Sequence, residues 1–93
     1  MAKNKITKEI NKLDKEIVEL ISKRARKVHE LALLRDSEEE ITKNNRVNEI
    51  IQNVRQTAIK EELSPSMIDD IYQIMIKEMI VLEITEYKNK KFF

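Results

Sequence analysis

Two arginines stand on the apolar face of a predicted helix in the first third of the chain. Arg24 fills a gap in the helical stripe of apolar residues, and Arg35 takes the next position after its end. Burying an unpaired cation is costly, so these side chains either extend to water along their apolar stems or meet an anion. The pattern indicates an edge position or an anion site. The stripe comprises Ile6, Ile10, Leu13, Ile17, Leu20, Ile21, Val28 and Leu31.

Two further charged residues lie on or beside apolar stripes elsewhere in the chain. Arg46 sits at the edge of the stripe within the second predicted helix, and Glu83 falls on the stripe of the third, in line with Ile76 and Met79. A glutamate near a helix end is also compatible with simple solvent exposure. The candidate chemistry is therefore cations on apolar faces, plus one carboxylate.

Several kinds of chemistry are excluded by composition. The chain has no Cys, which excludes disulfides and thiol catalysis, and no Gly, which excludes phosphate-binding glycine loops. The single His29 has no Cys or second His to complete a zinc site. No serine has a histidine nearby in sequence, so a hydrolytic triad is not expected. We expect neither a metal nor a cofactor.

The elements that must position these residues are helices. Charged residues make up 38% of the 93 residues, with one Pro, which predicts an all-α protein with a single domain over residues 1–93. We expect a long first helix over 5–35, a second from 41–45 to 62, and a third over 65–87. The pair Asn44-Asn45 is a second possible break before the second helix.

Two helix starts have specific signals. Ser37 and Glu40 have the spacing of a capping box. Ser64 can cap the third helix, with Pro65 at its first position, where a missing N–H costs nothing.

Charge and length bound the partners of the chain. The net charge is +1 with basic and acidic residues intermixed, which argues against nucleic-acid binding. No apolar run is long enough to span a membrane, and no signal peptide is evident, so we expect a cytoplasmic protein. A first helix of roughly 45 Å is too long to pack wholly on its own chain, which favours a homo-oligomer.

The sequence resembles the all-helical chorismate mutases of the AroQ class over nearly its whole length. The first helix carries Ile10-x-x-Leu13-Asp14-x-x-Ile17-x-x-Leu20-Ile21-x-x-Arg24, and the likeness continues through Leu63-Ser64-Pro65 to Ile71-Tyr72-x-x-Met75-Ile76. The resemblance implies an intertwined homodimer with paired first helices. It also implies conversion of chorismate, a dicarboxylate, to prephenate in aromatic amino-acid biosynthesis, in one pericyclic step.

The resemblance assigns roles to four residues. Arg24 and Arg46 match arginines that bind substrate carboxylates. Arg35 falls where the family has a lysine that contacts a carboxylate and the ether oxygen, and Glu83 where Gln, or sometimes Glu, faces that oxygen. A glutamate donates a hydrogen bond only when protonated. Burial would favour the protonated form of Glu83, whereas Arg35 would favour the ionised form. Because the role requires the protonated form, it predicts activity that rises toward acid pH.

Three site positions depart from the family pattern. Thr7 replaces an arginine that is donated across the dimer, and Met79 stands where several mutases have Ser. Val47 replaces a glutamate common in the mutases, and the pair Arg46-Val47 resembles the related isochorismate-pyruvate lyases, which share the fold. The alternatives to a mutase are therefore such a lyase, or a catalytically inactive helical dimer or interaction module.

Overall fold

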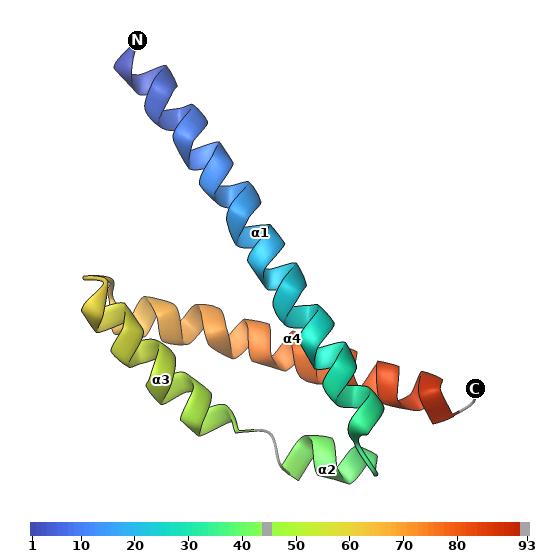
Figure 1. Cartoon of the computed structure of the whole chain (residues 1–93). Coiled ribbons are helices and arrows are strands. Elements are labelled where there is room, and N and C mark those ends of the chain that lie inside the picture. The colour runs from blue at the N-terminus through green and yellow to red at the C-terminus, as the bar shows by residue number, and fades with distance from the viewer. Residues whose placement is uncertain (44–45, 92–93) are drawn as a thin grey trace.

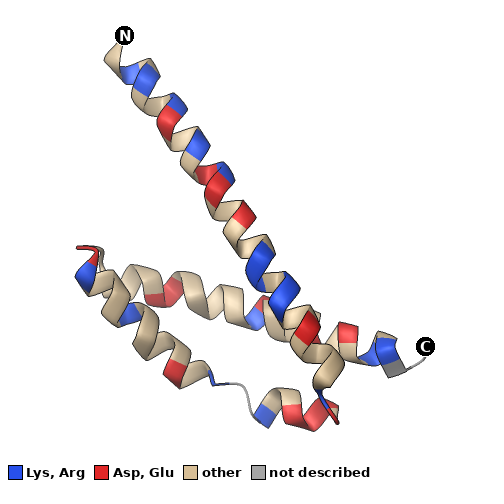
Figure 2. Cartoon of the chain, viewed as in Figure 1, with Lys and Arg blue, Asp and Glu red and all other residues tan. Residues whose placement is uncertain are grey.

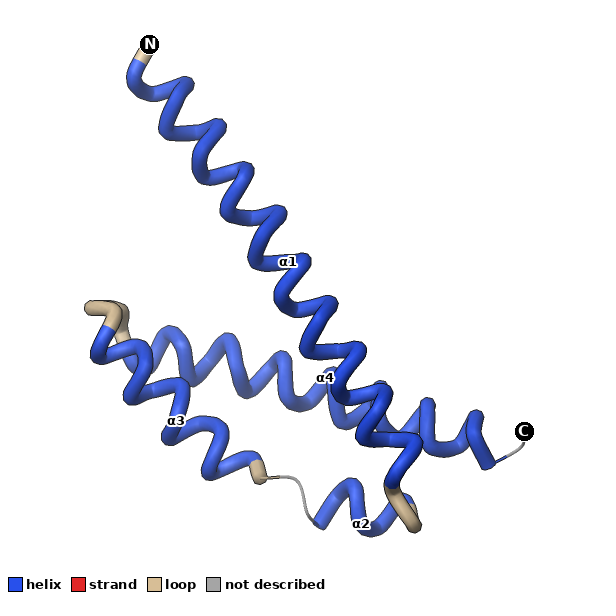
Figure 3. Tube along the Cα trace, viewed as in Figure 1, coloured by secondary structure: helices blue, strands red, loops and turns tan. Residues whose placement is uncertain are grey.

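The protein is entirely helical over the residues that the structure, a computed structural model, describes: 1–43 and 46–91. The helices are α1 (Ala2–Leu34), α2 (Glu38–Lys43), α3 (Val47–Lys60) and α4 (Pro65–Lys91) (Figures 1 and 3). The predicted all-α class and the three long helices are confirmed. The start expected at 41–45 for the second helix is wrong, because Ile41 belongs to a separate short helix, α2. The predicted break at Asn44-Asn45 lies outside the described residues.

Both predicted helix starts are capped by a serine. The backbone N–H of Glu40 donates to Ser37 Oγ at 3.1 Å, and that of Met67 donates to Ser64 Oγ at 3.2 Å. These bonds satisfy N–H groups that have no partner inside a helix. They fix where α2 and α4 begin.

The connection between α3 and α4 reverses the chain without a glycine. Glu62 has a φ of 60°, in the left-handed region that glycine normally occupies. Its N–H donates to Ile59 O at 3.1 Å, and that of Leu63 donates to Ala58 O at 2.8 Å. This is the hydrogen-bond pattern of a Schellman motif, so the backbone of a glutamate closes α3.

Packing centres on α4. Helix α3 runs alongside it, and the C-terminal part of α1 crosses it (Figure 1). An ion pair of 2.9 Å between Arg55 and Asp69 joins α3 to α4. The buried apolar side chains come from all four helices, so the core lies where they meet: Ala32, Ile41, Ile51, Ala58, Ile76, Met79 and Tyr87.

The first two-thirds of α1 extends away from the other helices (Figure 1). Residues 1–23, which we call the α1 arm, are all exposed, and its stripe residues Ile6, Ile10, Leu13 and Ile17 are about half exposed. Charged residues of both signs occupy much of the rest of the arm (Figure 2). The radius of gyration is 16.5 Å, against about 13 Å for a compact chain of this length. The prediction that α1 cannot pack wholly on its own chain is confirmed.

Over residues 1–43 and 46–91, no helix is long and apolar enough to cross a membrane.

Candidate active site

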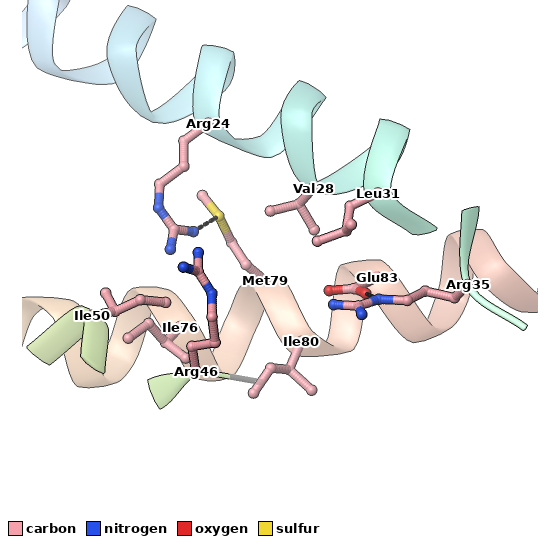
Figure 4. Close-up of a pocket in the computed structure, with 10 residues that line it drawn as sticks. All are labelled: Arg24, Val28, Leu31, Arg35, Arg46, Ile50, Ile76, Met79, Ile80 and Glu83. Carbon is pink, nitrogen blue, oxygen red and sulfur yellow. Dashed lines mark hydrogen bonds and ion pairs between the residues drawn. The ribbon is translucent and has the colours of Figure 1, made fainter. Parts of the chain in front are cut away.

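A cavity of about 170 Å³ lies between α1, α3 and α4. The C-terminal half of α1, the start of α3 and the middle of α4 supply its walls, and Figure 4 shows the side chains that face it. Its charged members are three arginines and one glutamate. The lining comprises Arg24, Val28, Leu31, Arg35, Arg46, Ile50, Ile76, Met79, Ile80 and Glu83.

Arg24 and Arg46 converge on one side of this cavity. Their guanidinium groups point toward each other in Figure 4. Nη1 of Arg24 donates to the thioether of Met79 at 2.6 Å, but a thioether is a weak acceptor that carries no charge. Arg46, with 69% of its side chain exposed, contacts Glu49 at 3.4 Å. Two cations that face each other repel one another, so the arrangement favours an anion between them.

Arg35 and Glu83 form an ion pair on the other side of the cavity. Nε of Arg35 donates to Oε2 of Glu83 at 2.7 Å. Glu83 is 4% exposed, the one buried charged residue among those described. Arg35 reaches it because it directly follows the last residue of α1, with an extended backbone (φ −73°, ψ 141°) that turns the chain toward α4. The pair places a cation and a carboxylate side by side in an apolar surround.

Glu40 of α2 is a second partner of Arg35. Nη1 of Arg35 donates to Oε1 of Glu40 at 3.3 Å, and Oε2 of Glu40 accepts the backbone N–H of Asp36 at 3.0 Å. That backbone N–H, with the nearby Arg35 charge, holds the pKa of Glu40 below its ordinary value against the effect of burial. Burial alone would lower the pKa of Arg35, but Glu83 and Glu40 outweigh it and the pKa is raised. Arg35 is therefore charged at any working pH.

The turn that carries Arg35 is tied to α4. Nζ of Lys90 donates to the carbonyl oxygens of Leu33 at 2.7 Å and Arg35 at 2.6 Å, and the hydroxyl of Tyr87 donates to Asp36 O at 3.2 Å. Lysine is suited to this position because the last carbonyls of a helix lack partners within it and carry partial negative charge. These contacts fix the end of α1 over the same helix that presents Glu83.

The structure brings together five of the seven residues predicted from the sequence: Arg24, Arg35, Arg46, Met79 and Glu83 all line the cavity. The remaining two lie elsewhere. Thr7 is on the α1 arm and donates to Lys3 O at 2.9 Å. Val47 is the first residue of α3, partly buried but outside the lining.

Sequence reasoning missed Glu40 as a neighbour of the site. The spacing from Ser37 signalled only a capping box at the start of α2. Its serine half is formed, because Ser37 Oγ accepts the N–H of Glu40, but the Glu40 carboxylate accepts the N–H of Asp36 in place of that of Ser37. Nothing in that spacing shows that its carboxylate reaches back to Arg35. His29 contacts Glu86 of α4 at 3.0 Å and is half exposed.

The chemistry available is recognition of a small anion with more than one negative group. Three guanidinium groups and one carboxylate give the lining a net charge of +2, and the remaining walls are apolar. Apolar walls strengthen such interactions by excluding water. Among the described residues, no cluster of three or more His, Asp or Glu could hold a metal ion.

The fold is thus all-helical over the described residues, with a cationic pocket between its long first helix, α3 and α4. The family model for chorismate mutase type II matches residues 6–84, a span that includes all five clustered residues. The chain belongs to the chorismate mutase type II family. Among curated proteins and among solved structures, no match was found.

Proposed function

We propose that the protein is a chorismate mutase, which converts chorismate to prephenate. The observation that carries the proposal is the convergence of Arg24, Arg35, Arg46 and Glu83 on one apolar-walled cavity within a chain of this family. The three guanidinium groups of the lining suit the two carboxylates of chorismate. The reaction would serve aromatic amino-acid biosynthesis in the cytoplasm.

The rearrangement needs positioning and charge stabilisation rather than a covalent step. Arg24 and Arg46, which face each other, would hold one carboxylate between them, while Arg35 would bind the second carboxylate and approach the ether oxygen. This arrangement would hold chorismate in its compact reactive conformer. As the C–O bond breaks, negative charge grows on the ether oxygen, where Arg35 and a protonated Glu83 would stabilise it.

We propose that the working form is an intertwined homodimer. The α1 arm exposes an apolar stripe that its own chain does not cover, and burial of such side chains drives association. The partner's arm would then bring its own Thr7 position toward the cavity, as the family resemblance implies. On this proposal the cavity of one chain is completed by the other.

Elimination of pyruvate from isochorismate is the second candidate function. It is favoured by the pair Arg46-Val47, which resembles the lyase branch. Val47 does not line the cavity of the single chain. Its position therefore does not favour the lyase over the mutase through direct contact with the substrate.

A paired assay tests both candidates. Chorismate and isochorismate are supplied separately to the wild type, to Arg24→Ala, and to Arg26→Ala as a matched control. Arg26 is exposed on the same helix and contacts Ser22. We expect prephenate from chorismate, a loss of at least about 100-fold in kcat/KM for Arg24→Ala, and little change for Arg26→Ala.

Two other outcomes are informative. Salicylate and pyruvate from isochorismate, with no prephenate from chorismate, would move the protein to the lyase branch. No turnover of either substrate, together with no rise in melting temperature on adding them, would contradict both enzymatic candidates and favour an inactive helical dimer.

A further inference from the structure

Arg35 is held by two carboxylates that approach it from different elements. Glu83 on α4 accepts from its Nε at 2.7 Å, and Glu40 on α2 accepts from its Nη1 at 3.3 Å. A guanidinium has five N–H groups in a fixed plane, so these two bonds leave three for an anion. Because hydrogen bonds hold both Nε and Nη1, the plane of the guanidinium group is fixed before any ligand binds.

Glu40 is itself anchored. Its second carboxylate oxygen accepts the N–H of Asp36 at 3.0 Å, and its own N–H donates to Ser37 Oγ at 3.1 Å. The residue that restrains Arg35 is thus fixed to the turn that follows Arg35 in the chain. Its side chain is partly buried, with 28% exposed, while that of Arg35 is 13% exposed.

We propose that Glu40 is a positioning residue for Arg35, one that aims the guanidinium into the cavity while Glu83 occupies its Nε edge. This inference rests on the proposed function in assigning Arg35 to the substrate, but the restraint itself exists without substrate. Without Glu40, the only side-chain carboxylate on Arg35 is that of Glu83 among the described residues. The guanidinium is then held at Nε alone, so it leaves Glu83 more often and its free N–H groups lose their direction.

The test observes the Nε–H of Arg35 directly. The chain has five arginines, so a nitrogen–proton spectrum of the guanidinium region has five Nε–H signals, and loss of one in Arg35→Lys assigns Arg35. Exchange of this proton with water is compared in the wild type, Glu40→Ala and Glu40→Gln. Glu39→Ala is the matched control, because Glu39 is an exposed acid of the same helix that pairs with Lys43 instead.

We expect Arg35 Nε–H exchange to accelerate at least about tenfold in Glu40→Ala. Loss of the charged hydrogen bond at Nη1 lets the guanidinium turn away from Glu83 more often, and its Nε–H can exchange with water only when it has left Glu83. In Glu40→Gln, which keeps an acceptor but no charge, we expect a smaller acceleration of roughly threefold or more. Glu39→Ala should match the wild type. Unchanged exchange in the Glu40 variants that fold would overturn the proposal, and Glu40→Gln covers the case in which Glu40→Ala does not fold.

Ser37→Ala separates positioning from the stability of α2. This change removes the cap of α2 and leaves both carboxylates of Arg35 in place. We expect an effect on exchange smaller than that of Glu40→Ala. An equal effect would mean that Glu40 acts only by holding α2 together, and the proposal would fail.

Kinetics supply a second readout. We expect kcat for chorismate to fall roughly tenfold in Glu40→Ala with less change in KM, because orientation matters most in the transition state. A normal kcat with rapid Nε–H exchange would overturn the link to catalysis. If the wild type does not turn over chorismate, the proposed function fails, and the exchange measurement still decides whether Glu40 restrains Arg35.

Discussion

At the scale of single residues, Arg35 differs in kind from the lysine that the resemblance places at its position. A lysine ammonium is a compact charge with three rotatable donors, whereas a guanidinium is a rigid planar fork with five. Arg35 uses this fork to bind Glu83 and Glu40 through different nitrogens. The substitution therefore changes which donors reach a ligand, while the positive charge is kept.

Glu83 gives the sharpest prediction at this scale. If it donates to the ether oxygen it must carry a proton, because an ionised carboxylate can only accept hydrogen bonds. Activity of the wild type should then rise as pH falls from about 8 to about 5. Glu83→Gln has an N–H donor at every pH, so its activity should be flat over this range and higher than that of the wild type near neutral pH. Steady-state kcat/KM across the pH range measures both effects.

A flat profile for the wild type would contradict donation by Glu83. Arg24→Ala is a useful companion in the same series, since it should lower activity at every pH and leave the shape of the profile unchanged.

The inward placement of the site residues could be predicted from the sequence, because helical period fixes the face of each position. Arg24 and Glu83 interrupt apolar stripes, and both line the cavity. Arg35 lines it too, but it follows the last residue of α1 and takes an extended backbone, so helical period does not fix its direction. The bond between Arg35 and Glu40 could not be predicted in this way. It depends on the extended backbone of Arg35 and on a side-chain rotamer in the turn, and neither has a periodic signature.

At the scale of elements, the chain reversal at Glu62 places a side chain where glycine is usual. The left-handed region costs a residue with a Cβ about 1–2 kcal/mol, and glycine would remove this cost. Glycine also has greater freedom in the unfolded chain, which offsets part of the stabilisation. We expect Glu62→Gly to raise the free energy of unfolding by up to about 1 kcal/mol, measured by urea denaturation. Glu61→Gly is the matched control and should lower it, since Glu61 has a φ of −90°.

A decrease for Glu62→Gly as large as that for Glu61→Gly would contradict the assigned backbone conformation. The helix starts at Ser37 and Ser64 were predictable because a side-chain cap has a sequence signature. The pair Asn44-Asn45 offered a possible break before the second helix, but the sequence pattern did not predict that residues 38–43 form a short helix of their own.

At the scale of the whole molecule, the α1 arm determines the oligomeric prediction. We expect the wild type to sediment at twice the 11.1 kDa mass of the chain. Replacing two stripe residues together, Ile10→Gln with Leu13→Gln, should weaken the dimer at least about 100-fold, because each buried aliphatic side chain contributes roughly 1.5–3 kcal/mol. Sedimentation across a concentration series measures the dissociation constant.

The matched control replaces two lysines of the same arm, Lys12→Gln with Lys15→Gln. Both lysines are exposed, outside the apolar stripe, so the dimer should persist. A wild-type protein that sediments as a monomer at micromolar concentration would rule out the intertwined dimer.

The order in which the protein folds follows from the distances along the chain between contacting residues. The ion pair that joins α3 to α4 closes a separation of 14 residues, whereas Arg35 and Glu83 are 48 apart and Arg24 and Met79 are 55 apart. Closing a longer loop costs more entropy, so we expect the α3–α4 hairpin to form first and α1 to dock last. The site would then be the last region to assemble and the first to open. Substitutions within it should speed unfolding and leave the rate of folding almost unchanged.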